Sequence, residues 1–245
     1  MGQFIGVAVK RVEEAEHRQR RPDKKGDARV SFGRVPLASC SGDVTGRSSN
    51  LVVHSGFDVN FWIESGPPSV DLVRPSCCPR CKSASRIPGK PLGLIGHGLR
   101  ERQLRGPRSA TESATTRPLL VRRYLCRDCG AVLVVVPRQV LARRHFAAGA
   151  IGLALFLFGK LGARAADAAK RAGSWATGPS AWRTLRRWLT AVEAGHLFGA
   201  VRHAPRGWPP RRRAERAAMT LSAHVPETFA PDELARVFAG AALAA

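Results

Sequence analysis

Acidic residues are scarce in this sequence. Its 245 residues include 18 Asp and Glu against 40 Lys and Arg, which gives a formal net charge of +22. A chain this basic typically binds a polyanion such as DNA, RNA or an anionic membrane surface. The excess is concentrated, because residues 73–129 carry thirteen basic and three acidic side chains and residues 130–195 carry ten and two. We therefore expect residues 73–195 to face the polyanion.

A long hydrophobic run is also missing. The most apolar stretch, residues 146–159 (FAAGAIGLALFLFG), is about 14 residues long, whereas a membrane-spanning helix needs about 20. The start of the chain has an apolar stretch, but no charged region precedes it and no cleavage site follows it. We expect a buried core helix at residues 146–159, no membrane partner, and a cytoplasmic, nucleoid-associated protein.

Only six cysteines are present, and four of them form two closely spaced pairs. Cys78 and Cys81 are separated by two residues, as are Cys126 and Cys129. This spacing lets both sulfurs of a pair reach one ion, and four thiolates complete the tetrahedral shell that structural zinc prefers. In a reducing cytosol such pairs favour metal over disulfides. The sequence predicts one structural Zn²⁺ held by these four residues.

Two alternatives to this ligand set stay open at the sequence level. Cys77 abuts Cys78 and could replace it as a ligand. The pairs could also be redox thiols, although a redox CxxC motif is expected at the start of a helix in a βαβ unit. Gly130 follows the second pair and suits the backbone of a knuckle turn, whereas Lys82 takes that place after the first pair.

The order of patterns predicts an α+β fold. We expect a disordered basic tail at residues 1–50, which could be an upstream extension, and a short ordered lead-in at residues 51–72. A zinc-ribbon β-hairpin module follows at residues 73–137, and a mainly α-helical helix-turn-helix region at residues 138–200. C-terminal accessory helices occupy residues 201–245. Within the hairpin module the predicted parts are an extended run at Leu92–Leu104, a polar tip at Arg105–Arg117, and strands at Leu119–Leu125 and Ala131–Val136.

The sequence pattern after Pro137 predicts helices. The predicted helices cover Val140–Phe158, Ala163–Arg171 capped by Gly173, Ala181–Ala194 after a turn at Ser174–Pro179, Arg211–Ala223, and a last helix opened by Pro231-Asp232.

The predicted helix at Ala181–Ala194 has an apolar side and a basic side. Six residues fall on the apolar side: Ala181, Trp182, Leu185, Trp188, Leu189 and Val192. The opposite side carries Arg183, Arg187, Thr190 and Ala194, flanked by Thr184 and Arg186. Such a helix suits the major groove of double-stranded DNA, where Arg can read guanine edges. The simpler interpretation is a solvated helix face.

Further phosphate contacts are expected from the predicted hairpin. Its candidate residues are Arg100, Arg102, Arg105, Arg108, Arg122 and Arg123. Contacts to phosphate would position the protein on a duplex without reading its sequence.

The order of motifs carries a family resemblance. CPRC, GHGLRER, RRYLCRDCG, VPR, RRHF and WRTLRRW follow one another across roughly residues 57–245. This order resembles an uncharacterised bacterial family, found with insertion-sequence elements, that combines a zinc ribbon with a helix-turn-helix and looks like the N-terminal DNA-binding region of transposases. The resemblance implies that Cys78, Cys81, Cys126 and Cys129 bind metal and that the helix of Arg183 and Arg187 faces DNA.

The sequence departs from transposases in lacking a recognisable catalytic domain. The acidic residues after Cys129 lie in Ala- and Arg-rich helical sequence and not at strand ends, where Mg²⁺-binding carboxylates are expected. We therefore expect no enzymatic activity, and catalysis, if any, in a separate transposase or integrase subunit. The alternative is a zinc-ribbon adaptor that binds RNA or a transcription or translation complex. A nuclease or thiol oxidoreductase is a third possibility.

Overall fold

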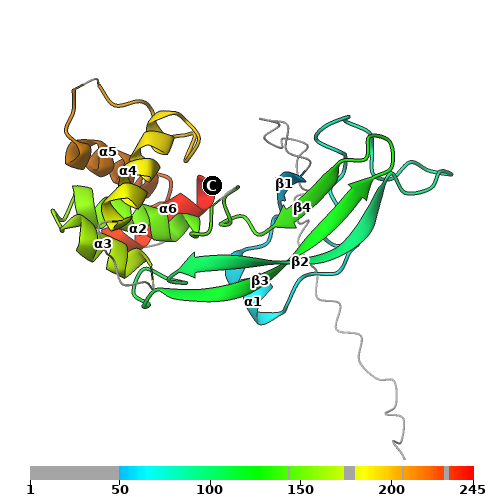
Figure 1. Cartoon of the computed structure of the whole chain (residues 1–245), viewed down its shortest axis with the longest axis horizontal. Coiled ribbons are helices and arrows are strands. Elements are labelled where there is room, and N and C mark those ends of the chain that lie inside the picture. The colour runs from blue at the N-terminus through cyan, green and yellow to red at the C-terminus, as the bar shows by residue number, and fades with distance from the viewer. Residues whose placement is uncertain (1–49, 143, 174–179, 206, 229–231) are drawn as a thin grey trace, which may run out of the picture. The chain divides into compact units, whose positions relative to one another are not determined.

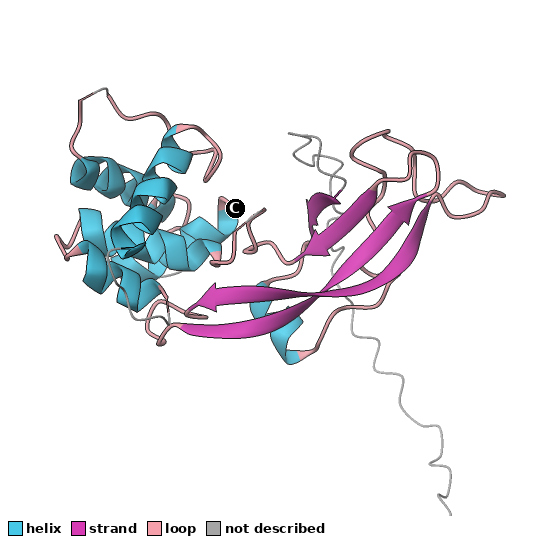
Figure 2. Cartoon of the chain, viewed as in Figure 1, coloured by secondary structure: helices cyan, strands magenta, loops and turns pink. Residues whose placement is uncertain are grey.

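The fold joins one four-stranded sheet to a group of packed helices (Figure 1). A computed structural model describes residues 50–245 except 143, 174–179, 206 and 229–231. The predicted tail at residues 1–50 lies outside this range except for its last residue, and so does the predicted turn at Ser174–Pro179. Within the described part the α+β class is confirmed, with strands first and most helices after them (Figure 2).

The sheet is built on a long antiparallel hairpin. Its strands are β1 (Asn50–His54), β2 (Leu94–Gly106), β3 (Thr115–Cys126) and β4 (Val132–Val136), in the spatial order β1-β4-β3-β2. β2 pairs with β3 and β3 with β4 in antiparallel fashion, while β1 joins β4 in parallel. The extended segments predicted from sequence therefore correspond to β2, β3 and β4, but the strands extend further, so that the tip is shorter than Arg105–Arg117.

The segment before the hairpin contributes a strand and a short helix to the sheet core. Helix α1 (Val59–Glu64) begins after Asp58, whose Oδ1 accepts a hydrogen bond from the Phe61 N–H at 2.8 Å. Trp62 of this helix is 1% exposed, and its indole Nε1 donates to the Leu120 carbonyl at 2.6 Å. Strand β4 is almost entirely buried because it lies between β1 and β3 in the middle of the sheet.

The helical part surrounds one apolar helix. Helix α2 (Ala148–Gly159) buries ten of its twelve residues, as expected for a core helix. It contacts α3 (Ala165–Ala172), α4 (Ser180–Glu193), α5 (Pro210–Ser222) and α6 (Glu233–Leu243). Glycines permit this close packing: a Cβ at Gly159 would collide with the backbone of α5 at Glu215, and one at Gly240 with the Leu221 carbonyl. No helix in the described part is long and apolar enough to span a membrane.

Helix α2 begins later than the sequence pattern suggests. A start at Val140 is wrong, because the described residues from Val140 to Ala147 are not helical, and Phe146 forms a parallel β-bridge with Arg105 of β2. The Arg105 N–H donates to the His145 carbonyl at 2.7 Å, and the Ala147 N–H donates to the Arg105 carbonyl at 3.0 Å. These hydrogen bonds satisfy backbone groups that a helix would otherwise use. Gly173 does follow α3, but with an extended backbone and not the left-handed one expected of a glycine cap.

Candidate metal centre and basic groove

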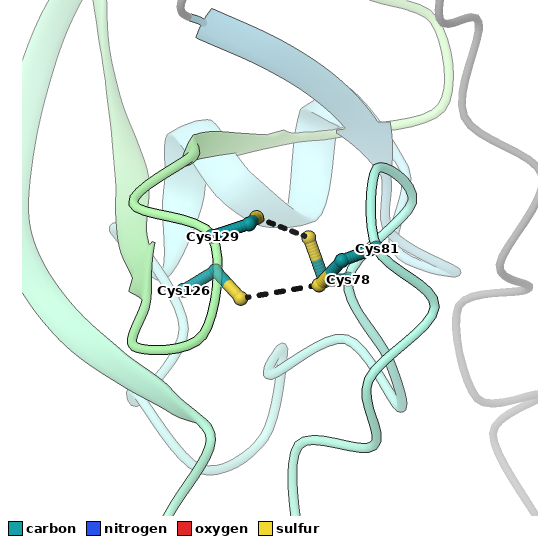
Figure 3. Close-up of side chains that lie close together, drawn as sticks. All are labelled: Cys78, Cys81, Cys126 and Cys129. Carbon is teal, nitrogen blue, oxygen red and sulfur yellow. Dashed lines mark hydrogen bonds between the residues drawn. The ribbon is translucent and has the colours of Figure 1, made fainter.

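Four cysteine sulfurs converge at the end of the β2–β3 hairpin farthest from its tip. Cys126 is the last residue of β3 and Cys129 lies in the turn to β4, while Cys78 and Cys81 face them from the loop before β2 (Figure 3). The four Sγ atoms all lie within 4.8 Å of one another. Cys78 Sγ lies 3.7 Å from Cys129 Sγ, and Cys81 Sγ lies 3.6 Å from Cys126 Sγ. These four residues could hold one metal ion, as the sequence predicts.

The two cysteine pairs lie on turns of matching geometry. In the first turn the Lys82 N–H donates to the Cys78 carbonyl at 2.8 Å, and in the second the Gly130 N–H donates to the Cys126 carbonyl at 3.0 Å. Each turn is closed by a second pair: Cys78 N–H to the Ser83 carbonyl, and Cys126 N–H to the Ala131 carbonyl, both at 2.9 Å. Two cysteine knuckles with the same turn geometry are typical of a structural metal site.

The sulfur environments differ in burial and in hydrogen bonding. Burial raises the pKa of Cys129 to about 12 and raises that of Cys126 as well. Cys81 is exposed, and hydrogen bonding by the Ser83 side chain lowers its pKa to about 6. Since metal binds thiolates, a cation entering this site would displace protons from Cys126 and Cys129.

The setting of the pairs differs from that of a redox motif. One pair lies in a loop and the other joins two strands, so neither begins a helix. The structure also separates the two neighbouring cysteines that the sequence left open. Cys78 belongs to the cluster, whereas Cys77 is not a member. The backbone of Cys77 pairs with that of Ala84 in an isolated antiparallel β-bridge, and Cys77 has a further interaction outside the cluster.

Helix α4 has the two-sided character that the sequence predicts. Leu185, Trp188, Leu189 and Val192 are buried against the other helices, and Ala191 joins them. Arg183, Arg186, Arg187 and Thr190 are exposed, and Thr184 is half-buried. The side chains of Ala181 and Trp182 are not described. Helices α3 and α4 contact each other, but the turn between them lies outside the described residues.

The exposed side of α4 forms part of a basic groove of about 440 Å³. We define the basic groove by its lining residues: Arg144, Arg183, Arg186, Arg187, Thr190, Ala191, Ala194 and His196. Sequence reasoning missed Arg144 and His196 because they lie outside α4. The RRHF motif marks the neighbourhood of Arg144, but only the fold places it beside α4.

Several arginines of the hairpin have intramolecular partners. Arg102 Nη2 donates to the Leu141 carbonyl at 2.6 Å and to the Arg144 carbonyl. Arg122 Nε donates to the Pro68 carbonyl at 2.6 Å, and Arg108 forms an ion pair with Glu64. Arg105 lies over the Phe146 ring. Among the residues predicted to contact phosphate, Arg100 is exposed and Arg123 half-buried.

Comparison with family models, with curated proteins and with solved structures finds no match for this chain. The functional argument therefore depends on the geometry of the cysteine cluster and of the basic groove.

Proposed function

We propose that this chain is a zinc-containing DNA-binding protein, related to transposase DNA-binding regions and without catalytic activity of its own. The observation that carries the proposal is the basic groove, where three arginines of α4 and Arg144 share one depression with no acidic residue among its described lining residues. Guanidinium groups bind phosphate strongly through paired hydrogen bonds, so a surface of this kind suits a nucleic-acid backbone.

Zinc is proposed from the chemistry and spacing of the four sulfurs. A tetrahedral site with Zn–S bonds of about 2.3 Å has sulfurs about 3.8 Å apart. Two sulfur pairs, at 3.6 and 3.7 Å, approach that separation. Four thiolates leave no open coordination position, so the metal would stabilise the fold and take no part in a reaction.

The acidic residues of the helical part support a non-catalytic assignment. Asp167 pairs with Arg164 at 2.8 Å, Glu193 pairs with Arg213, and Glu215 lies 3.9 Å from Lys160. These three carboxylates each have a basic partner, and the described residues group no carboxylates around a shared cation site. Strand cleavage, where it occurs, would then be the task of a separate transposase or integrase subunit.

The proposal is tested by binding of the full chain to fluorescent duplex DNA. Affinity should fall by at least about a hundredfold between roughly 50 and 200 mM salt, because phosphate contacts release counterions. The double variant Arg183→Ala/Arg187→Ala should lose at least about tenfold in affinity. Lys90→Ala/Arg117→Ala removes the same charge from residues outside the groove and should lose much less.

Two outcomes would reject the proposal. Affinity that does not change with salt would show that phosphate contacts are not used. If neither the unaltered chain nor the double variant binds duplex DNA, and both bind RNA or a protein complex equally well, the result would point to the adaptor alternative.

A further inference from the structure

The shape of the basic groove limits what part of DNA it can meet. Thr190 and Ala191 place short side chains near the end of α4 and Ala194 follows it, while three arginines line the earlier part of the helix. Arg144 and His196 line the depression from outside the helix. The exposed face of α4 therefore lies in an open depression, whereas a helix that reads base edges must project into the major groove.

The positive charge of the groove is not balanced by any acidic residue among its described lining residues. Its lining has four arginines and one histidine, and Glu193, the acidic residue of α4, pairs with Arg213. Thr190 Oγ1 donates to the Arg186 carbonyl at 3.0 Å, so its proton is engaged within the helix. The donors free to face a ligand are thus mainly guanidinium groups, which match the geometry of phosphate oxygens.

We infer that the basic groove holds the sugar–phosphate backbone of one DNA strand and reads no base. A backbone is a convex, negatively charged ridge, which fits a concave and positively charged depression. From Arg183 to Glu193 the helix advances about 15 Å, enough to follow two or three consecutive phosphates. This inference rests on the proposed function and replaces base reading by α4 with phosphate positioning.

A side chain of the sheet binds the backbone segment that carries Arg144. Arg102 of β2 donates from Nη2 to the carbonyls of Leu141 and Arg144, although its own side chain does not line the groove. Arg102 is thus a positioning residue, because it fixes the backbone that carries Arg144. The binding surface is therefore assembled from the hairpin and the helices together.

The inference is tested with two duplexes of unrelated sequence, each titrated at several salt concentrations. Arg144→Ala and Arg187→Ala should each lower affinity by about tenfold for both duplexes and reduce the salt slope by about one. Arg102→Met should lower affinity in the same way, but the double variant Arg102→Met/Arg144→Ala should lose little more than Arg144→Ala alone. Lys90→Ala, which removes one exposed positive charge outside the groove, is the matched control.

The outcomes separate this inference from the proposed function. If the unaltered chain binds duplex DNA with steep salt dependence but the Arg144 variant binds equally well, the groove is not the site. If Arg187→Ala changes the preference between the two duplexes, α4 reads bases and the inference is wrong. Additive losses from Arg102→Met and Arg144→Ala would show that Arg102 does not act through Arg144. Absence of duplex binding by the unaltered chain would reject the proposed function itself.

Discussion

Lys82 and Gly130 share one backbone conformation at equivalent positions of the two cysteine turns, with φ angles of 63° and 69°. Glycine adopts this left-handed conformation at little cost, whereas a residue with a Cβ is strained in it by about 1 kcal/mol or more. The first turn therefore tolerates strain that the second avoids, and both still present their cysteines to the same cluster.

This equivalence predicts unequal effects of exchanging the two residues. Gly130→Ala should lower the free energy of unfolding by about 1 kcal/mol, because a Cβ there meets no atoms but strains the backbone. Lys82→Gly should not destabilise the protein, since it relieves the same strain. Urea unfolding of the zinc-loaded chain measures both changes, and equal destabilisation by the two variants would contradict the prediction.

Metal analysis should find about one zinc per chain, bound by the four clustered cysteines. Cys126→Ser should abolish tight binding and lower the melting temperature, because the loss of one thiolate opens the shell. Cys77→Ser is the control, since Cys77 lies outside the cluster, and it should keep the metal. Retention of zinc by Cys126→Ser together with its loss from Cys77→Ser would mean that the ligand set is wrong.

Zinc affinity should fall as the pH falls. In the metal-free chain the pKa of Cys129 is about 12 and that of Cys126 is also raised, so both hold protons at neutral pH. Metal must displace at least those two protons, and affinity should therefore drop by about a hundredfold or more per pH unit. Cys81, with a pKa of about 6, adds proton competition only below about that pH. Competition with a chromophoric chelator at about pH 7 and 8 tests this, and equal affinities would refute it.

Close helix packing predicts a large effect of one methyl group. Gly240→Ala should destabilise the protein by about 1–3 kcal/mol, because the added Cβ would overlap the Leu221 carbonyl of α5 and force α6 away. Gly199→Ala is the control, since a Cβ there meets no atom within 4 Å. Thermal unfolding compares them, and a Gly240→Ala variant as stable as the control would show that the helices pack less closely.

The inward position of Arg102 should also affect the free energy of unfolding. Arg102→Met should lower the free energy of unfolding by about 1–3 kcal/mol, because the carbonyls of Leu141 and Arg144 lose a charged donor. Arg100→Ala should be nearly neutral, since that side chain is exposed. Chemical denaturation of both variants gives the comparison, and a neutral Arg102→Met would mean that these hydrogen bonds contribute little.

Local patterns in the sequence were sufficient for most of the elements. The apolar and basic sides of α4 follow from helical periodicity, and the cysteine pairs follow from their spacing. The start of α6 after Asp232 follows from capping, since Asp232 Oδ2 accepts a hydrogen bond from the Ala235 N–H at 3.0 Å. Each of these features is decided by residues within a few positions of one another.

Contacts between distant segments could not be predicted in this way. Strand β1 pairs in parallel with β4, about eighty residues later, and the apolar residues of β1 alone do not announce that partner. The late start of α2 depends on hydrogen bonds to Arg105, and the inward position of Arg102 runs against the usual exposure of arginine. Arg144 and His196 join the groove for the same reason, because only tertiary packing brings them to α4.

The length of the β2–β3 hairpin connects the cysteine cluster to the basic groove. The strands pair from Leu94 and Cys126 at the cluster to Gly106 and Thr115 near the helices, with one register shift between Gly96 and Leu99, and Arg102 lies opposite Leu119. A slip of one residue in this pairing would turn each shifted side chain to the other face of the sheet, and Arg102 would leave Leu141 and Arg144. A metal bound at Cys126 would oppose such a slip. If the chain binds DNA as proposed, metal occupancy and DNA affinity should be thermodynamically linked, so that each ligand tightens the binding of the other without any shared contact.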